Sequence, residues 1–71
     1  MSSDDIILIV KHRGQYEGYW VMGDWPIKIN DIRRQPLRFK VLSIEEAILS
    51  AQEIHTEYGY QFVNLKKQRR R

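Results

Sequence analysis

Asp5-Ile6-Ile7-Leu8-Ile9-Val10-Lys11-His12-Arg13 holds the longest apolar run of the chain and decides its fold. Five consecutive aliphatic residues bounded by charged ones are typical of a β-strand that is buried on both faces. Because side chains alternate along a strand, Ile6, Leu8 and Val10 should face one side of a sheet, and Ile7 and Ile9 the other. The stretch therefore predicts a strand that needs apolar cover on both sides.

The residues after this strand continue the β pattern. The expected elements are, in chain order, a hairpin connection at 14–18, a return strand at 19–22, a turn at 23–26 and an alternating, half-buried strand at 37–41. Residues 27–36 have the composition of a loop, although 27–30 are compatible with a short edge strand.

One helix is expected over 44–58. Ser43 and Glu46 have the spacing of a capping box, in which the serine hydroxyl accepts from the Glu46 amide. Gly59 stands where a left-handed C-cap would end the helix, and 60–65 has the pattern of a final strand. The apolar stripe of this helix consists of Ile44, Ala47, Ile48, Ala51, Ile54 and Tyr58.

Together these elements predict the α+β class. We expect a small, mainly antiparallel sheet of three to five strands with one helix packed on one face, in the order β-β-β-α-β. The expected organisation is a frayed N-terminus at 1–4, a single domain at 5–65 and a disordered basic tail at 66–71.

The net charge of +3 is unevenly distributed, because residues 66–71 hold five of the twelve Lys and Arg residues and no acid. Residues 1–65 retain seven basic against nine acidic residues, a net charge of −2. The chain has no cysteine, which excludes disulfides and is compatible with a reducing cytoplasm, where we expect the protein to act. It contains neither a signal-like segment nor an apolar run long enough to span a membrane.

A sheet that is apolar on both faces but is served by one helix leaves one face to be covered. Large exposed apolar surfaces usually bind partners, so the pattern favours a small, non-enzymatic accessory or regulatory protein-binding module that forms a homodimer. The alternative is that the 27–36 loop and the termini fold over that face. The residues expected to contact the partner are Ile7, Ile9, Tyr19 and Trp25.

A second hypothesis, from a different class, is nucleic-acid binding by the basic residues. If those in the body converge with the tail they would form a phosphate-binding strip; otherwise they are a solvated sheet face. The candidates are Lys11, Arg13, Arg33, Arg34, Arg38, Lys40, Lys66, Lys67, Arg69, Arg70 and Arg71.

The sequence contains no catalytic or metal-binding motif. His12 could pair with Asp4, Asp5 or Asp24, and His55 with Glu53 or Glu57, but none of these pairs has the spacing of a known site. We therefore expect no enzyme activity, no metal, no cofactor and no small-molecule substrate.

The segments Glu17-Gly18-Tyr19-Trp20-Val21 and Ser43-Ile44-Glu45-Glu46-Ala47 resemble two motifs of the HicB-type antitoxin domains. In that family a Gly-Tyr-containing second strand and a Ser/Thr-x-Glu-Glu-Ala helix start lie on a β-β-β-α-β frame. This chain differs in lacking the proline-glycine turn after strand two and in having the long 27–36 insertion. The resemblance implies the frame, and it connects the nucleic-acid hypothesis with an antitoxin-like module.

Overall fold

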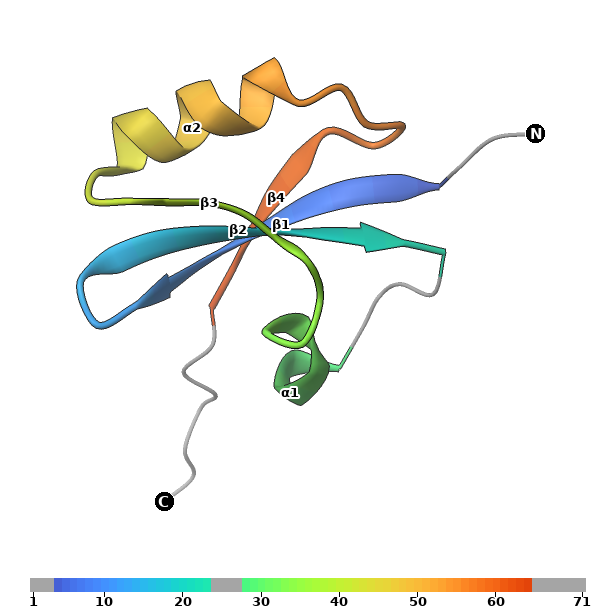
Figure 1. Ribbon diagram of the computed structural model, residues 1–71, viewed down its shortest axis with the longest axis horizontal. Helices are drawn as coiled ribbons and strands as arrows, with labels where there is room; N and C mark the ends of the chain where they lie inside the picture. The colour runs from blue at the N-terminus through green and yellow to red at the C-terminus, as the bar shows by residue number, and fades with distance from the viewer. Residues whose placement is uncertain (1–3, 24–27, 65–71) are drawn as a thin grey trace.

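The computed structural model describes residues 4–23 and 28–64, which form a four-stranded mixed sheet with a helix on each face (Figure 1). The strand order is β3-β2-β1-β4, with β4 parallel to β1 and the other neighbours antiparallel. The expected small, mainly antiparallel α+β fold with a helix on the sheet is confirmed. The elements are β1 (Asp5–His12), β2 (Gln15–Met22), α1 (Ile29–Ile32), β3 (Leu37–Val41), α2 (Ile44–Glu53) and β4 (Tyr60–Val63).

The hairpin between β1 and β2 is tighter than predicted. Arg13 and Gly14 alone connect the strands, both with positive φ, at 55° and 79°. Two such residues in a row match the twist of the flanking strands. Gly18 therefore lies inside β2, opposite Phe39 of β3, where a Cβ would overlap the Phe39 ring.

The face of the sheet toward α2 holds one half of the core. Ile7 and Ile9 are completely buried there beneath Ala47 and Ala51. The two alanines keep the helix close to the sheet because they add little side-chain bulk at the contact. Partly buried residues surround this group: Tyr16, Trp20, Phe39, Val41, Ile54 and Tyr60.

The opposite face is covered by α1, which lies across the sheet from α2 (Figure 1). Ile32 of α1 is only 1% exposed and packs with the core side chains of β1 and β2 on that face. The short edge strand considered for 27–30 is wrong, because residues 29–32 form this helix. That core group consists of Ile6, Leu8, Val10, Tyr19 and Val21, with Val63 beside it.

The helix α2 begins as predicted and ends earlier. The Ser43 Oγ accepts a hydrogen bond from the Glu46 amide at 3.2 Å, so the predicted N-cap is confirmed. The expected continuation to residue 58 is wrong, because α2 ends at Glu53. Asp5 holds the following segment outside the helix: its carboxylate accepts from the Glu57 amide at 2.6 Å, and its carbonyl from the Tyr58 amide at 2.9 Å.

Candidate functional site

The two edges of the sheet differ in chemistry. β3, at one edge, carries Arg38 and Lys40, follows Pro36 and pairs with β2 through an irregular register at Gly18 and Tyr19. Charges, prolines and bulges are the usual devices that keep an edge strand from pairing with another chain. β4, at the other edge, has none of these devices, since residues 58–64 contain no charged residue and no proline.

The backbone of β4 can pair on its outer edge, the side facing away from β1. The Gly59 carbonyl accepts from the Ile7 amide at 2.9 Å, so the backbone groups of Gly59, and of every second residue after it, point toward β1. In a β-ladder every second residue directs both its amide and its carbonyl to the same neighbour. Tyr60 and Phe62 consequently direct their backbone groups outward, and within the described part of the chain no strand pairs with that edge.

Aromatic side chains flank this outer edge. Tyr60 is partly buried in the core beneath α2, whereas Phe62 is 41% and Tyr58 53% exposed. The rings of Tyr60 and Phe62 lie edge to face, with centroids 6.1 Å apart and planes at 87°. We name Tyr58, Tyr60 and Phe62, with the outer edge of β4, the β4 patch.

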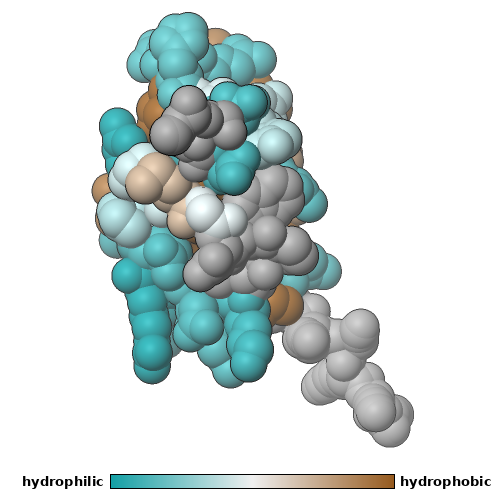
Figure 2. All heavy atoms as spheres, turned by 90° about the vertical axis from the view of Figure 1, so that its right-hand side faces the viewer, coloured by the Kyte–Doolittle hydropathy of each residue, from teal (hydrophilic) through white to brown (hydrophobic). Residues whose placement is uncertain are grey.

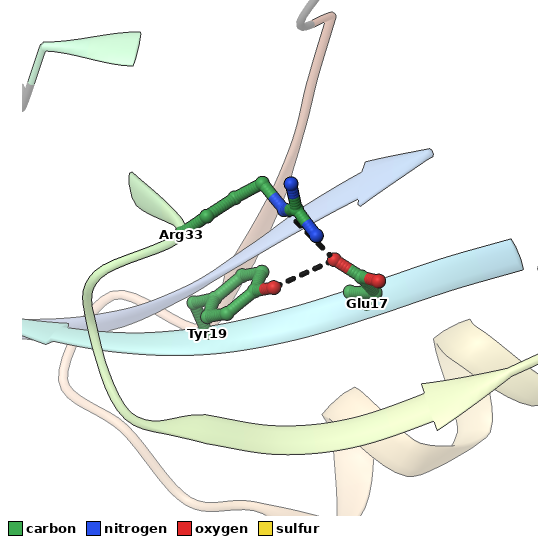
Figure 3. A network of polar contacts seen from close by, with 3 residues as sticks. All are labelled: Glu17, Tyr19 and Arg33. Carbon is green, nitrogen blue, oxygen red and sulfur yellow. Dashed lines mark hydrogen bonds and ion pairs between the residues drawn. The ribbon is translucent and has the colours of Figure 1, made fainter. Parts of the chain in front are cut away.

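On the face covered by α1, a buried carboxylate ties the chain after α1 to the sheet (Figure 3). Glu17 Oε1 accepts from the Tyr19 hydroxyl at 2.6 Å and from Arg33 Nε at 3.3 Å, and the Glu17 side chain is only 5% exposed. Burial raises the pKa of Glu17, but the Tyr19 hydrogen bond and the charge of Arg33 outweigh it and leave the pKa below its ordinary 4.5. A carboxylate that is ionised and accepts two hydrogen bonds is suited to holding the chain in place rather than to donating a proton.

The same network shifts the pKa of Tyr19 upward, in the opposite direction to that of Glu17. Burial and the hydrogen bond to Glu17 raise the pKa of Tyr19 above its ordinary 10.0. Tyr19 is therefore a neutral hydrogen-bond donor at physiological pH.

Three of the four residues expected to contact a partner are not accessible. Ile7 and Ile9 are 0% exposed under α2, and Tyr19 is 5% exposed among the residues packed with Ile32. In the folded chain none of these three is therefore available to a partner, because α2 covers Ile7 and Ile9 and α1 covers the face that holds Tyr19. Trp25 lies outside the described residues.

The basic residues of the body gather partly at one end of the sheet, the end with the Arg13–Gly14 turn, which we name the hairpin end. Lys40 of β3 stands opposite Glu17 of β2 in the strand register, on the face where Arg33 also binds Glu17. Exposed Lys11 and Arg13 lie at the same end, with the Lys11 ammonium 5.8 Å from the centroid of the Tyr16 ring. Val63 pairs with Val10, so the chain also leaves β4 at the hairpin end.

The other basic candidates are less concentrated. Arg34 lies 3.8 Å from the Asp31 carboxylate in an exposed ion pair within the α1 segment. Arg38, like Lys40, is exposed, and the alternation of β3 puts both on the α1 side, since Phe39 packs beneath α2. The tail candidates Lys66, Lys67, Arg69, Arg70 and Arg71 lie outside the described residues.

The opposite end of the sheet, where β1 begins, we name the Asp5 end. Asp4 and Glu57 are exposed there, and Figure 2, which views the molecule from this end, shows a mainly hydrophilic surface in its coloured part. The Asp5 carboxylate, which also accepts from Trp20 Nε1 at 3.3 Å, fixes the chain before β4.

The histidine–acid pairs considered from the sequence are not brought together. His12 and Asp5 are at opposite ends of β1, roughly 23 Å apart at the rise of an extended strand. No hydrogen bond or ion pair joins His55 to Glu53 or Glu57 within residues 4–23 and 28–64, and Asp24 lies outside them. In the same described ranges no group of three or more His, Cys, Asp or Glu side chains could hold a metal ion.

Sequence reasoning missed Phe62 and the pairing of Glu17 with Arg33. The lack of charged residues in 58–64 could have pointed to Phe62, but it indicates a binding edge only once β4 is known to be an outer strand. The second joins residues 16 positions apart through an irregular segment, and no local pattern announces it.

No protein-family model matches the chain, and no curated protein or solved structure is significantly similar to it. Within the described residues, no helix is both long and apolar enough to cross a membrane.

Proposed function

We propose that this protein is a non-enzymatic accessory or regulatory module that binds protein by adding a strand to the outer edge of β4. The observation that carries the proposal is the contrast between the two sheet edges: β3 is charged and irregular, whereas β4 is uncharged and directs the backbone groups of Tyr60 and Phe62 outward. A cytoplasmic location is part of the proposal and is supported only by the absence of cysteine.

Strand addition is a common mode of protein recognition in which main-chain hydrogen bonds provide affinity and alternate side chains provide specificity. In the β4 patch the backbone amides and carbonyls of Tyr60 and Phe62 would form these main-chain hydrogen bonds. Each net hydrogen bond is worth about 0.5–1.5 kcal/mol. The exposed rings of Phe62 and Tyr58 would provide the side-chain contacts, and aromatic residues are frequent hot spots of protein interfaces.

The test is a capture experiment with three tagged proteins: the wild type, Phe62→Lys and Leu49→Lys. Leu49 is 61% exposed on α2 and is the matched control, because it receives the same charge on an exposed apolar residue outside the β4 patch. We expect the wild type and Leu49→Lys to retain the same protein from a native extract, and Phe62→Lys to lose it. Equal retention by all three proteins would reject the β4 patch as the binding site.

The specific observation that favours the second candidate, nucleic-acid binding, is that Lys11, on the α2 side, Lys40, on the α1 side, and Arg13 in the turn all lie at the hairpin end, where the chain continues toward 66–71. Such binding would weaken steeply with salt, because each phosphate contact releases counterions. Fluorescence anisotropy with a labelled oligonucleotide should show tight binding only at low salt, and Lys40→Glu should weaken it. Binding that is absent at low salt would eliminate this candidate.

A further inference from the structure

We infer that the strand added to β4 is the β4 strand of a second copy, so that two chains form one continuous eight-stranded sheet. This inference rests on the proposed function and names its partner. A two-fold axis perpendicular to the sheet brings the same edge of two copies together with antiparallel strands, as in other isologous interfaces. Three properties of the described residues favour a second copy.

The first property is the direction of the backbone groups. Tyr60 and Phe62 both direct their amide and carbonyl outward. When Gln61 lies on the two-fold axis, Tyr60 of one copy stands opposite Phe62 of the other, and the two residues exchange both main-chain hydrogen bonds. The symmetry repeats the pair, so no outward group of these two residues is left over.

The second property is the arrangement of side chains. Residues opposite each other in an antiparallel pair project from the same face, so the Tyr60–Phe62 pairs would lie on the α2 side of both copies. Each chain already holds its own two rings edge to face. The dimer would join these two pairs into one group of four rings and cover Phe62, which is 41% exposed in the single chain.

The third property is charge. Antiparallel pairing sets the hairpin end of one copy beside the Asp5 end of the other. In the segments nearest β4, exposed Lys11 and Arg13 belong to the first end and exposed Glu57 to the second, the mainly hydrophilic end seen in Figure 2. The exposed Glu45 and Glu46 also lie at the hairpin end, but they start α2 just after β3, at the far edge of the sheet from β4. The two-fold symmetry repeats this contact between a basic and an acidic end, so opposite charges attract in the antiparallel arrangement. A parallel arrangement would set like ends together.

A single introduced cysteine tests the pairing directly, because the chain has none of its own. On the axis, the two copies of residue 61 form a non-hydrogen-bonded pair with Cα atoms about 4.5 Å apart, within the range that a disulfide spans. Gln61→Cys should therefore give a covalent dimer on mild oxidation. Gln52→Cys, on the exposed side of α2, is the matched control and should stay largely monomeric under the same conditions.

Sedimentation equilibrium over micromolar to millimolar concentrations provides the second measurement. We expect a concentration-dependent dimer for the wild type and for Leu49→Lys, weakened by salt. Phe62→Lys should be monomeric, since it sets two like charges beside the axis. Its circular dichroism and urea unfolding verify that the variant is folded.

The outcomes separate this inference from the proposed function. A wild type that is monomeric at every concentration, yet retains a different protein through the β4 patch, overturns the homodimer and leaves strand addition in place. A dimer that Phe62→Lys does not weaken, or that crosslinks no better through Cys at 61 than at 52, overturns the β4 interface. A monomer that also retains no protein overturns both.

Discussion

At the scale of single residues, the Glu17 carboxylate is the polar group on which the α1 side of the molecule depends. It accepts from Tyr19 and from Arg33, and its own side chain is 5% exposed whereas that of Arg33 is 45% exposed. Removing the charge leaves two donors with a weaker acceptor. We expect Glu17→Gln to lower the free energy of unfolding by about 1–3 kcal/mol at pH 7, measured by urea denaturation.

The same residue gives the stability a definite dependence on pH. Because the pKa of Glu17 is lower in the folded chain than its ordinary 4.5, its contribution is present above about pH 4.5 and is lost as the pH falls through the folded value. Urea titrations from pH 7 to pH 3 should show a smaller decline for Glu17→Gln than for the wild type. The control is Asp31→Asn, whose exposed ion pair with Arg34 should contribute little at either pH. An equal decline in the wild type and Glu17→Gln would contradict the role assigned to this carboxylate.

Gly18 is the second residue with a sharp requirement, because the Phe39 ring occupies the space of its missing side chain. We expect Gly18→Ala to destabilise the fold by about 1–3 kcal/mol through overpacking, as measured by urea denaturation. The double variant Gly18→Ala/Phe39→Leu should recover part of the loss, because the smaller side chain leaves room. Strict additivity of the two changes would show that the contact with the ring is not the cause.

At the scale of elements, the N-terminus of α2 depends on one hydroxyl. Ser43 Oγ accepts from the Glu46 amide, which otherwise has no partner within the first helical turn. We expect Ser43→Ala to cost about 1 kcal/mol of unfolding free energy. Ser50→Ala, inside the same helix, should be nearly neutral because alanine is a good helix former. Thermal unfolding of the two variants side by side makes the comparison, and equal melting temperatures would argue against the cap.

Elements defined by their own residues were predictable, and elements defined by distant contacts were not. The aliphatic run of β1, the alternation of β3 and the Ser43 cap are local patterns, and each is found where the sequence predicts it. The end of α2 depends on Asp5, 52 positions away from Glu57, and α1 is held by Ile32 in the core of β1 and β2. Such contacts have no signature in the neighbouring sequence.

The candidate site follows the same division. The sequence correctly assigned Ile7 and Ile9 to one side of β1, but it misjudged what covers each side. It could not identify the β4 patch, because an outer edge is a property of strand order. Only the pairing of β4 with β1 reveals that Tyr60 and Phe62 direct their backbone groups away from the sheet.

At the scale of the whole molecule, the described core is complete by Val63, the last residue of β4. The six residues 66–71 contain no apolar side chain and five positive charges. We expect a chain that stops at Leu65 to keep the melting temperature of the full chain, measured by circular dichroism, and to lose most of any affinity for nucleic acid. A large fall in melting temperature would show that the tail contributes to folding, and unchanged affinity would show that the tail is not the nucleic-acid site.

The pairing of β1 with β4 also has a consequence for biosynthesis. Among the described strands the most apolar one, β1, is made before the others, yet the amide of Glu57 that binds Asp5 belongs to a residue made 52 positions later. At ~5–20 residues per second, the run from Ile6 to Val10 waits roughly 3 to 10 seconds for its last neighbour. A short, uncharged β-branched run exposed for that long is prone to aggregate. Translation that stops before β4 should therefore yield insoluble fragments, because only a chain that includes β4 has a strand on both sides of β1.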